Sequence, residues 1–230
     1  LCLSDWNVST IERSVADGLK IAGRTQLDGV FHLAGHMDMA PLQSITASHW
    51  QAVMQAKAES ALAIASYLQA SWPRSVLVQY GSLNSYFGGQ AAAAYSAANA
   101  VQSAVTDHLN INTSVRSWCL NWSVWQGAGM AAQFTSAELQ IARNKGFLPL
   151  NTQQDSKLIQ RLLQLAPANY FVGLDPSNPE IQGQLSPANR FIEQIDLFAG
   201  VSRCQQADGV RSLLQAISPV LMPHAHTPLW

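Results

Sequence analysis

The chain has 230 residues, of which 48% are apolar and only 12% are charged, and its net charge is −1. This charge gives no electrostatic basis for binding nucleic acid, and the basic residues are too scattered to hold the chain on a membrane surface. No apolar run reaches the roughly 18 residues of a membrane-spanning helix, and no signal peptide is recognisable. Three widely spaced cysteines favour a reducing, cytoplasmic setting and indicate neither a disulfide framework nor a metal site.

Helices and strands are expected to alternate along the chain. Helices are predicted at residues 9–22, 49–71, 91–110 and 152–165, with Ser9 and Ser48 as N-caps of the first two, and strands at residues 28–34, 75–80, 115–120 and 170–174. Residues 123–150 are expected to be irregular. Because the strands are apolar throughout and alternate with helices, they should be parallel and covered on both faces. The predicted fold class is an α/β, doubly wound, Rossmann-like parallel sheet.

The last part of the chain differs in character. Prolines interrupt it from Pro176 onward, and only short helices are expected. We therefore assign residues 1–175 to the Rossmann-like domain and residues 176–230 to a linker with a small helical appendage. The alternative is that this segment packs back onto the main domain.

Four polar residues could form one reactive site. Tyr95 and Asn99 lie four residues apart on a predicted helix and therefore share one face. A tyrosine can give a proton to a developing alkoxide when a nearby cation raises its acidity. Lys57, a rare charge on an Ala-rich segment, could be that cation. Ser82 follows an apolar strand, where a doubly wound sheet binds its ligands, and its hydroxyl could hold a carbonyl oxygen.

Each of these residues also has an ordinary structural explanation. Ser82 could be a turn residue, Tyr95 a core residue, Asn99 a partner of a backbone carbonyl and Lys57 a solvated helix residue. Taken one at a time, these explanations are favoured. The case for a site rests on the order of all four residues together, through the resemblance that this order carries.

That order resembles a known family. The segments GVFHLAG (29–35), YGS (80–82), YSAAN (95–99), NWSVW (121–125) and GM (129–130), with Trp50 and Lys57 between the first two, are similar to the ketoreductase domains of modular polyketide synthases and nonribosomal peptide synthetases. These are extended short-chain dehydrogenase/reductases, and the resemblance covers about residues 1–174. Ordinary members of the superfamily carry the lysine four residues after the tyrosine and the asparagine on the earlier helix. Here the two positions are exchanged, as in the polyketide-type domains.

The resemblance implies a role for each residue. Tyr95 would protonate the carbonyl oxygen, and Ser82 would hydrogen-bond to the same atom. Lys57 would lower the pKa of Tyr95 and contact the nicotinamide ribose of NADPH, while Asn99 would support a proton relay. The substrate would be a β-keto or α-keto acyl thioester on the phosphopantetheine of an acyl or peptidyl carrier protein.

The same resemblance assigns roles near the cofactor. Ala34 and Gly35 would lie beside the ribose, and Asp5 near the adenine. Trp125 and Met130 would begin a lid over substrate and nicotinamide, although Trp125 could also be an ordinary packing residue.

The stereochemical fingerprints of the family are not met. One type carries Leu-Asp-Asp where this chain has Met37-Asp38-Met39, and the opposite type carries a tryptophan where this chain has Phe87. The sequence therefore does not predict the stereochemistry of the product. The segment GLDPSNPEI (173–181) favours the subclass in nonribosomal peptide synthetases that reduces α-keto groups.

One expected part is missing from the sequence. The family grips the cofactor pyrophosphate with a glycine-rich loop, and no GxGxxG occurs in these 230 residues. Strand 28–34 would then be an unpaired edge, which is an aggregation hazard. We expect it to pair with a strand from an N-terminal Rossmann half, supplied by the same or another chain. The apolar composition fits a covered surface, and equally fits a compact Ala-rich fold.

Two other functions compete with an active reductase. The first is a non-catalytic structural Rossmann-like module of such a multienzyme, against which all four site residues argue. The second is a freestanding acyl-carrier-protein reductase, against which the exchanged lysine and asparagine argue.

Overall fold

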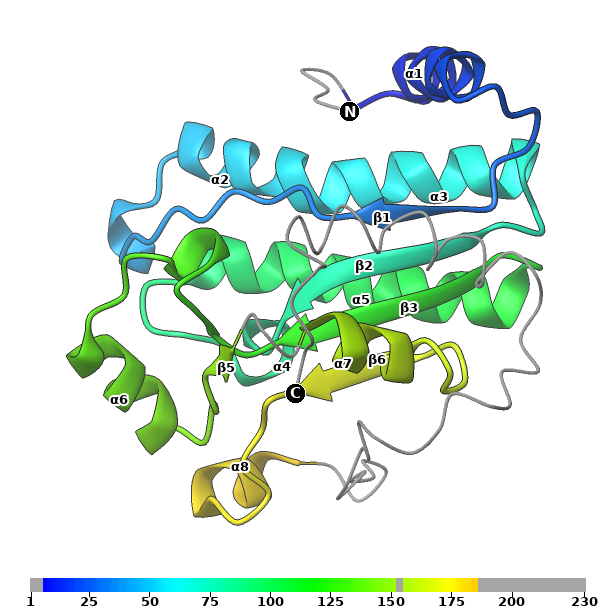
Figure 1. The fold of residues 1–230 in the computed structure, drawn as a ribbon. Coiled ribbons are helices and arrows are strands. Elements are labelled where there is room, and N and C mark those ends of the chain that lie inside the picture. Colours follow the sequence, from blue (N-terminus) through cyan, green and yellow to red (C-terminus); the bar gives the residue numbers. More distant parts are fainter. Residues whose placement is uncertain (1–5, 152–154, 186–230) are drawn as a thin grey trace. The chain divides into compact units, whose positions relative to one another are not determined.

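The computed structural model describes residues 6–151 and 155–185. Its main sheet has the strand order β1-β2-β3-β6, formed by β1 (Gly29–His32), β2 (Val76–Ser82), β3 (Arg116–Trp122) and β6 (Asn169–Val172) (Figure 1). β1 and β2 run parallel, with Gly29 opposite Val76. The predicted fold class, a Rossmann-like parallel sheet with flanking helices, is confirmed.

Helices connect the strands, as the alternation in the sequence predicts. They are α1 (Val8–Ile21), α2 (Ala47–Met54), α3 (Ser60–Ser71), α4 (Asn84–Phe87), α5 (Ala93–Asn112), α6 (Ser136–Asn144), α7 (Asp155–Leu162) and α8 (Pro179–Gln184). The structure also holds two 3-10 turns, η1 (Leu42–Ser44) and η3 (Gly129–Ala131), and a small parallel sheet of β4 (Trp125–Gln126) and β5 (Leu150–Asn151). Among the described residues, no helix is both long enough and apolar enough to cross a bilayer.

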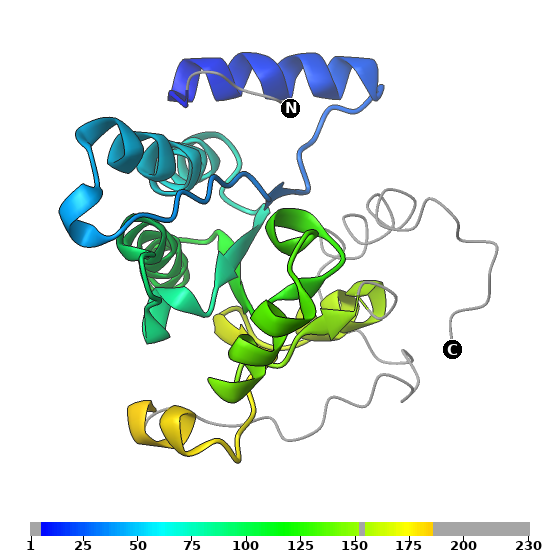
Figure 2. The same ribbon diagram turned by 90° about the vertical axis from the view of Figure 1, so that its left-hand side faces the viewer.

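The chain divides into two units, residues 1–121 with 167–170, and residues 122–166 with 171–230. In the first unit, α2, α3 and α5 lie along one face of strands β1 and β2 (Figure 2). Its core joins Leu68 of α3, Leu77 of β2 and Leu109 of α5, all fully buried. Burial of these side chains removes apolar surface from water and fixes the helices on the sheet.

The predicted helix 49–71 is two helices separated by a π-helical turn, η2 (Gln55–Glu59). A π turn holds one residue more than an α turn and is often found at functional sites. The hydroxyl of Ser60 donates to the carbonyl of Ala56 at 2.7 Å. This side-chain bond supplies a donor to the widened turn.

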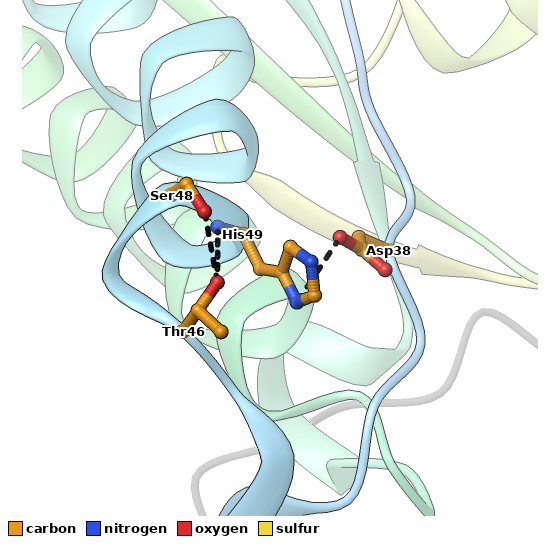
Figure 3. Close-up of polar contacts among 4 residues, drawn as sticks. All are labelled: Asp38, Thr46, Ser48 and His49. Atoms are coloured by element: carbon orange, nitrogen blue, oxygen red, sulfur yellow. Dashed lines mark hydrogen bonds and ion pairs between the residues drawn. The ribbon is translucent and has the colours of Figure 1, made fainter.

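The N-caps differ from those predicted. Asn7, not Ser9, caps α1, because its Oδ1 accepts from the Thr10 N–H at 2.9 Å. Thr46, not Ser48, caps α2 by accepting from the His49 N–H at 3.3 Å (Figure 3). Both helices begin earlier than their apolar periodicity suggests, so the cap also moves toward the N-terminus.

The segment after β1 is held against the start of α2. The Asp38 carboxylate lies 3.8 Å from Nδ1 of His49. Figure 3 shows the two side chains facing each other. The backbone N–H of Ala40 also donates to the carbonyl of Ala91, just before α5, at 2.9 Å. The loop at the carboxyl end of β1 is thereby fixed to two other elements of the first unit.

Two further predictions need correction. Residues 123–150 are not wholly irregular, because they contain α6, which a capping box of Thr135 and Glu138 starts. Strand 28–34 is shorter than predicted, and only His32 of β1 is buried. In the described part of the chain, β1 pairs with β2 on one side and with no strand on the other.

Candidate active site

Ser82 is the last residue of β2, at the carboxyl end of the sheet. Its Oγ accepts from the Asn84 N–H at 3.2 Å, which links the strand to α4. The preceding Gly81 is buried against β3, where a Cβ would meet Oδ1 of Asn121 and come within 2.9 Å of Sγ of Cys119. The absence of a side chain at Gly81 therefore lets β2 and β3 approach each other directly below Ser82.

Tyr95 and Asn99 lie one turn apart on α5, and both are buried. The Asn99 Nδ2 donates to the carbonyl oxygen of Tyr95 at 2.7 Å, which is the backbone bond that the ordinary explanation of Asn99 requires. The amide oxygen of Asn99 is nevertheless buried without a hydrogen-bond partner among the described residues. A buried acceptor left unpaired is costly, and in native proteins such atoms often mark a ligand or water site.

Lys57 occupies the centre of the π turn, and only 2% of its surface is exposed. Its Nζ donates to the carbonyl of Tyr80 at 2.8 Å and to Oε1 of Gln102 at 3.1 Å, and it lies 5.8 Å from the centre of the Tyr95 ring. The interpretation of Lys57 as a solvated helix residue is therefore wrong. The widened turn directs this cation into the first unit, beside the tyrosine.

Burial sets the protonation states of both residues. Loss of hydration lowers the pKa of Lys57 to about 8, although the nearby Cys119 acts in the opposite direction. Burial also raises the pKa of Tyr95 above 10.0, and hydrogen bonding with the side chains of Ser82 and Asn99 opposes this only in part. At neutral pH Tyr95 therefore holds its proton while Lys57 is charged, as an acid with an adjacent cation requires.

A chain of buried polar side chains continues from Lys57 and was not predicted from the sequence. Gln102 Nε2 lies 3.0 Å from Nδ1 of His32, and Nε2 of His32 lies 2.8 Å from Oγ of Ser60. Burial and the charge of Lys57 lower the pKa of His32 to about 4. A sequence signal did exist, because Tyr95, Asn99 and Gln102 follow the spacing of one helix face.

The other predicted residues are distributed over both units. Ala34 and Gly35 directly follow β1, and Phe87 ends α4 with its ring 5.1 Å from that of Tyr86. Asp5 lies outside the described residues.

Trp125 begins β4, with its ring centre 4.7 Å from that of Trp122, and Met130 is about half exposed in η3. Both belong to the second unit. The structure thus brings Ser82, Tyr95, Asn99 and Lys57 together in the first unit. Among the described residues, no group of three or more His, Cys, Asp or Glu side chains is placed to hold a metal ion.

Known proteins place the chain in a family. The family model described as "KR domain" matches residues 8–127, which is more than half of the chain. The chain belongs to the KR domain family. Its members are the ketoreductase domains of modular synthases, which are extended short-chain dehydrogenase/reductases. The resemblance drawn from YGS, YSAAN and Lys57 is therefore confirmed.

Curated relatives of this KR domain are much longer than the chain. Polyketide synthase GfsE from Streptomyces halstedii is 30% identical over 138 residues, which are 60% of this chain and 4% of that protein. Polyketide synthase GfsB from the same organism is 29% identical over 157 residues, 67% of this chain and 3% of that protein. The chain therefore spans only a few per cent of the length of these relatives.

Solved structures support the same fold. A structure described as the adenylation, ketoreductase and pseudo-Asub domains of a keto acid-selecting NRPS module superposes with a TM-score of 0.69 at 22% identity, covering 81% of this chain and 15% of that one. A-type ketoreductases from a modular polyketide synthase give a TM-score of 0.58 at 24% identity, with 70% of this chain and 34% of the other covered. At these identities the similarity establishes the fold.

Proposed function

We propose that this KR domain reduces a keto group on an acyl thioester carried by an acyl or peptidyl carrier protein, with NADPH as the reductant. The observation that carries the proposal is the buried Tyr95 with the Nζ of Lys57 5.8 Å from its ring centre. Family membership supports the reaction class. Relatives named polyketide synthases, and a similar structure from a keto acid-selecting NRPS module, support a carrier-bound substrate.

The proposed proton transfer uses three side chains. The Tyr95 hydroxyl gives its proton to the carbonyl oxygen as negative charge develops there, and the Ser82 hydroxyl holds the same oxygen. The positive charge of Lys57 stabilises the tyrosinate that forms. Oδ1 of Asn99 has no hydrogen-bond partner among the described residues, so a water molecule could donate a hydrogen bond to it. That water would begin the relay that returns the proton to Tyr95. When bound, the cofactor supplies the hydride.

The residues of the first unit fit the nicotinamide half of that cofactor. A charged lysine has three N–H donors, and two of those on Lys57 are used by Tyr80 and Gln102, which leaves one for a ribose hydroxyl. Ala34 and Gly35 follow β1 at the same end of the sheet, where backbone can approach a ligand. Asp5, Trp125, Met130 and Phe87 keep the roles implied by the family, near the adenine, in the lid and beside the substrate.

The pyrophosphate would be held by residues that this sequence does not contain, because it has no GxGxxG. We infer that an N-terminal Rossmann half, from the same or another chain, adds its strand to the free side of β1. The unpaired edge of β1 in the described part of the chain supports this pairing. Asp28 bonds to β2 through its carbonyl, so by alternation along the strand the N–H groups of Gly29 and Phe31 point to the free edge. Slow hydrogen exchange at Gly29 and Phe31 only when that half is present is the expected result.

The function is tested by the intact synthase polypeptide that carries this chain. With β-keto and α-keto thioester surrogates, we expect NADPH to be oxidised and the hydroxyacyl thioester to appear in equal amounts, with NADH slower. Cofactor oxidation without substrate turnover, or neither, contradicts the proposal and favours the structural-module alternative. The ratio of the reduction rates of the β-keto and α-keto surrogates shows which position of the keto group the domain prefers.

A further inference from the structure

A buried hydrogen-bond chain links Lys57 to three elements of the first unit. Lys57 Nζ donates to Gln102 Oε1, Gln102 Nε2 lies 3.0 Å from His32 Nδ1, and His32 Nε2 lies 2.8 Å from Ser60 Oγ. The hydroxyl of Ser60 then donates to the carbonyl of Ala56. Each of these side chains is at most 2% exposed, so none of the bonds is exchanged readily for water.

Only one assignment of the protons satisfies this chain. A charged lysine is purely a donor, so the amide atom of Gln102 that faces it must be the oxygen. The amide N–H₂ then faces His32, whose Nδ1 must accept and carry no proton. His32 is consequently neutral, with its proton on Nε2 and donated to Ser60.

The low pKa of His32, about 4, agrees with this assignment. If His32 gained a proton, its Nδ1–H would oppose the amide N–H₂ of Gln102. Turning the amide to relieve that contact would place N–H₂ against the Nζ of Lys57. A neutral His32 is therefore the condition under which Gln102 offers Lys57 an acceptor.

We propose that Gln102 is a positioning residue of this site: its side-chain amide, oriented by neutral His32, fixes the Nζ of Lys57 beside Tyr95. Tyr80 and Gln102 hold Nζ from two directions, at 2.8 and 3.1 Å. The remaining N–H is then directed rather than free to rotate among acceptors. Ser60 extends the same control to the π turn that carries Lys57, through its bonds to the carbonyls of Ala56 and Lys57.

Gln102→Leu tests the proposal because it keeps the side-chain size and removes the acceptor. The ionisable groups nearest Lys57 are His32 on β1, Cys119 on β3 and Tyr95 on α5, and this substitution leaves all three in place. Loss of a bond to the charged form should lower the pKa of Lys57 by about one unit. Thr106→Val, one turn further along the buried face of α5, is the matched control, because Thr106 bonds to Gln79 and Ser117 and not to Lys57.

The measurement is the ¹³Cε NMR titration of lysine in the full chain, which has only four lysines, with Lys57→Arg to assign the signal. We expect the Lys57 midpoint to fall in Gln102→Leu and to stay at its wild-type value in Thr106→Val. Gln102→Glu should raise it, because a carboxylate stabilises the ammonium. Gln102→Glu also allows the proposal to be tested if Gln102→Leu does not fold. An unchanged midpoint in either Gln102 variant overturns the proposal.

The catalytic consequence rests on the proposed function. The alkaline limb of the pH profile of kcat/KM should move with the NMR midpoint, so that reduction at pH 8.5 falls about sixfold more in Gln102→Leu than reduction at pH 6.5 does. A uniform loss at both pH values contradicts a positioning role. A shifted NMR midpoint in a protein that reduces no ketone supports the contact with Lys57 and counts against the proposed function alone.

Discussion

The Nζ of Lys57 lies 5.8 Å from the centre of the Tyr95 ring, and both side chains are almost fully buried. The two residues are 38 positions apart in the chain, on a π turn and on a helix that face each other in the first unit. Burial disfavours the charged form of each residue, so it lowers the pKa of Lys57 and raises the pKa of Tyr95. The site therefore keeps a cation beside a neutral acid at neutral pH, and this has measurable consequences for stability and rate.

Replacing Lys57 by methionine should stabilise the protein while abolishing reduction. The folded pKa of about 8 lies below the ordinary 10.5, so the unfolded chain binds the proton more tightly. The cost of burying the charge is complete below pH 8 and disappears as the pH rises from 8 to 10.5. We expect Lys57→Met to add about 1–3 kcal/mol to the free energy of unfolding at pH 7, and progressively less above pH 8.

Denaturant unfolding at pH 7 and pH 10 measures this difference. Lys20→Met, on the exposed last turn of α1, is the control, and should change the free energy by less than about 0.5 kcal/mol. A less stable Lys57→Met at pH 7 would contradict the burial argument.

Two asparagines of α5, Asn99 and Asn110, should separate stability from catalysis. The side-chain amide of Asn110 donates through Nδ2 to the carbonyl of Ser117 and accepts through Oδ1 from the Ser117 N–H, each at 2.8 Å. The Oδ1 of Asn99, in contrast, is buried without a partner among the described residues. Asn110→Leu should therefore lose about 1–3 kcal/mol of stability and keep its rate. Asn99→Leu should lose less stability and reduce kcat by roughly 10-fold or more, because the relay acceptor is removed. Equal effects of the two changes on kcat would refute the relay.

Stability should depend on the glycine at position 81 and not on the glycine at position 18. A Cβ at Gly81 would collide with Asn121 and lie 2.9 Å from Sγ of Cys119, while nothing lies within 4 Å of a Cβ at Gly18. Gly81→Ala should destabilise the protein by about 1–3 kcal/mol and displace Ser82. Gly18→Ala, inside α1, should stabilise it by about 0.5–1 kcal/mol. Thermal unfolding of the two variants tests this, and a neutral Gly81→Ala would mean that β2 and β3 can separate at no cost.

The sequence predicted the sheet because strands depend on local apolar patterns, whereas the four candidate site residues were assigned from the resemblance to the ketoreductase family. Apolar runs define the strands, and Tyr95 and Asn99 share a helix face by their spacing. The π turn at Lys57 was missed because it depends on tertiary contacts, including the bond of His32 to Ser60. Gln102 shares a helix face with Tyr95 and Asn99 by its spacing, but that spacing does not show that its amide bonds to Lys57 and His32, which lie on other elements.

The helix starts show a different limitation. The apolar periodicity of α2 begins after the true N-cap, so Ser48 was chosen where Thr46 makes the bond to His49. α6 was missed because its charged and polar residues hide the period, although the Thr135 and Glu138 capping box marks its start. Element ends depend on single hydrogen bonds that apolar patterns do not encode.

The central claim, that Tyr95 is the proton donor, is tested most directly by Tyr95→Phe in the full polypeptide that carries this chain, with reduction of a keto thioester measured as formation of the hydroxyacyl product. Tyr67→Phe is the matched control, because Tyr67 is equally buried and its hydroxyl accepts from Nε1 of Trp72 at 2.9 Å, outside the site. We expect Tyr95→Phe to lower kcat by about 10²–10⁴-fold with cofactor binding retained, and Tyr67→Phe to keep the wild-type rate. Wild-type reduction by Tyr95→Phe would contradict the account.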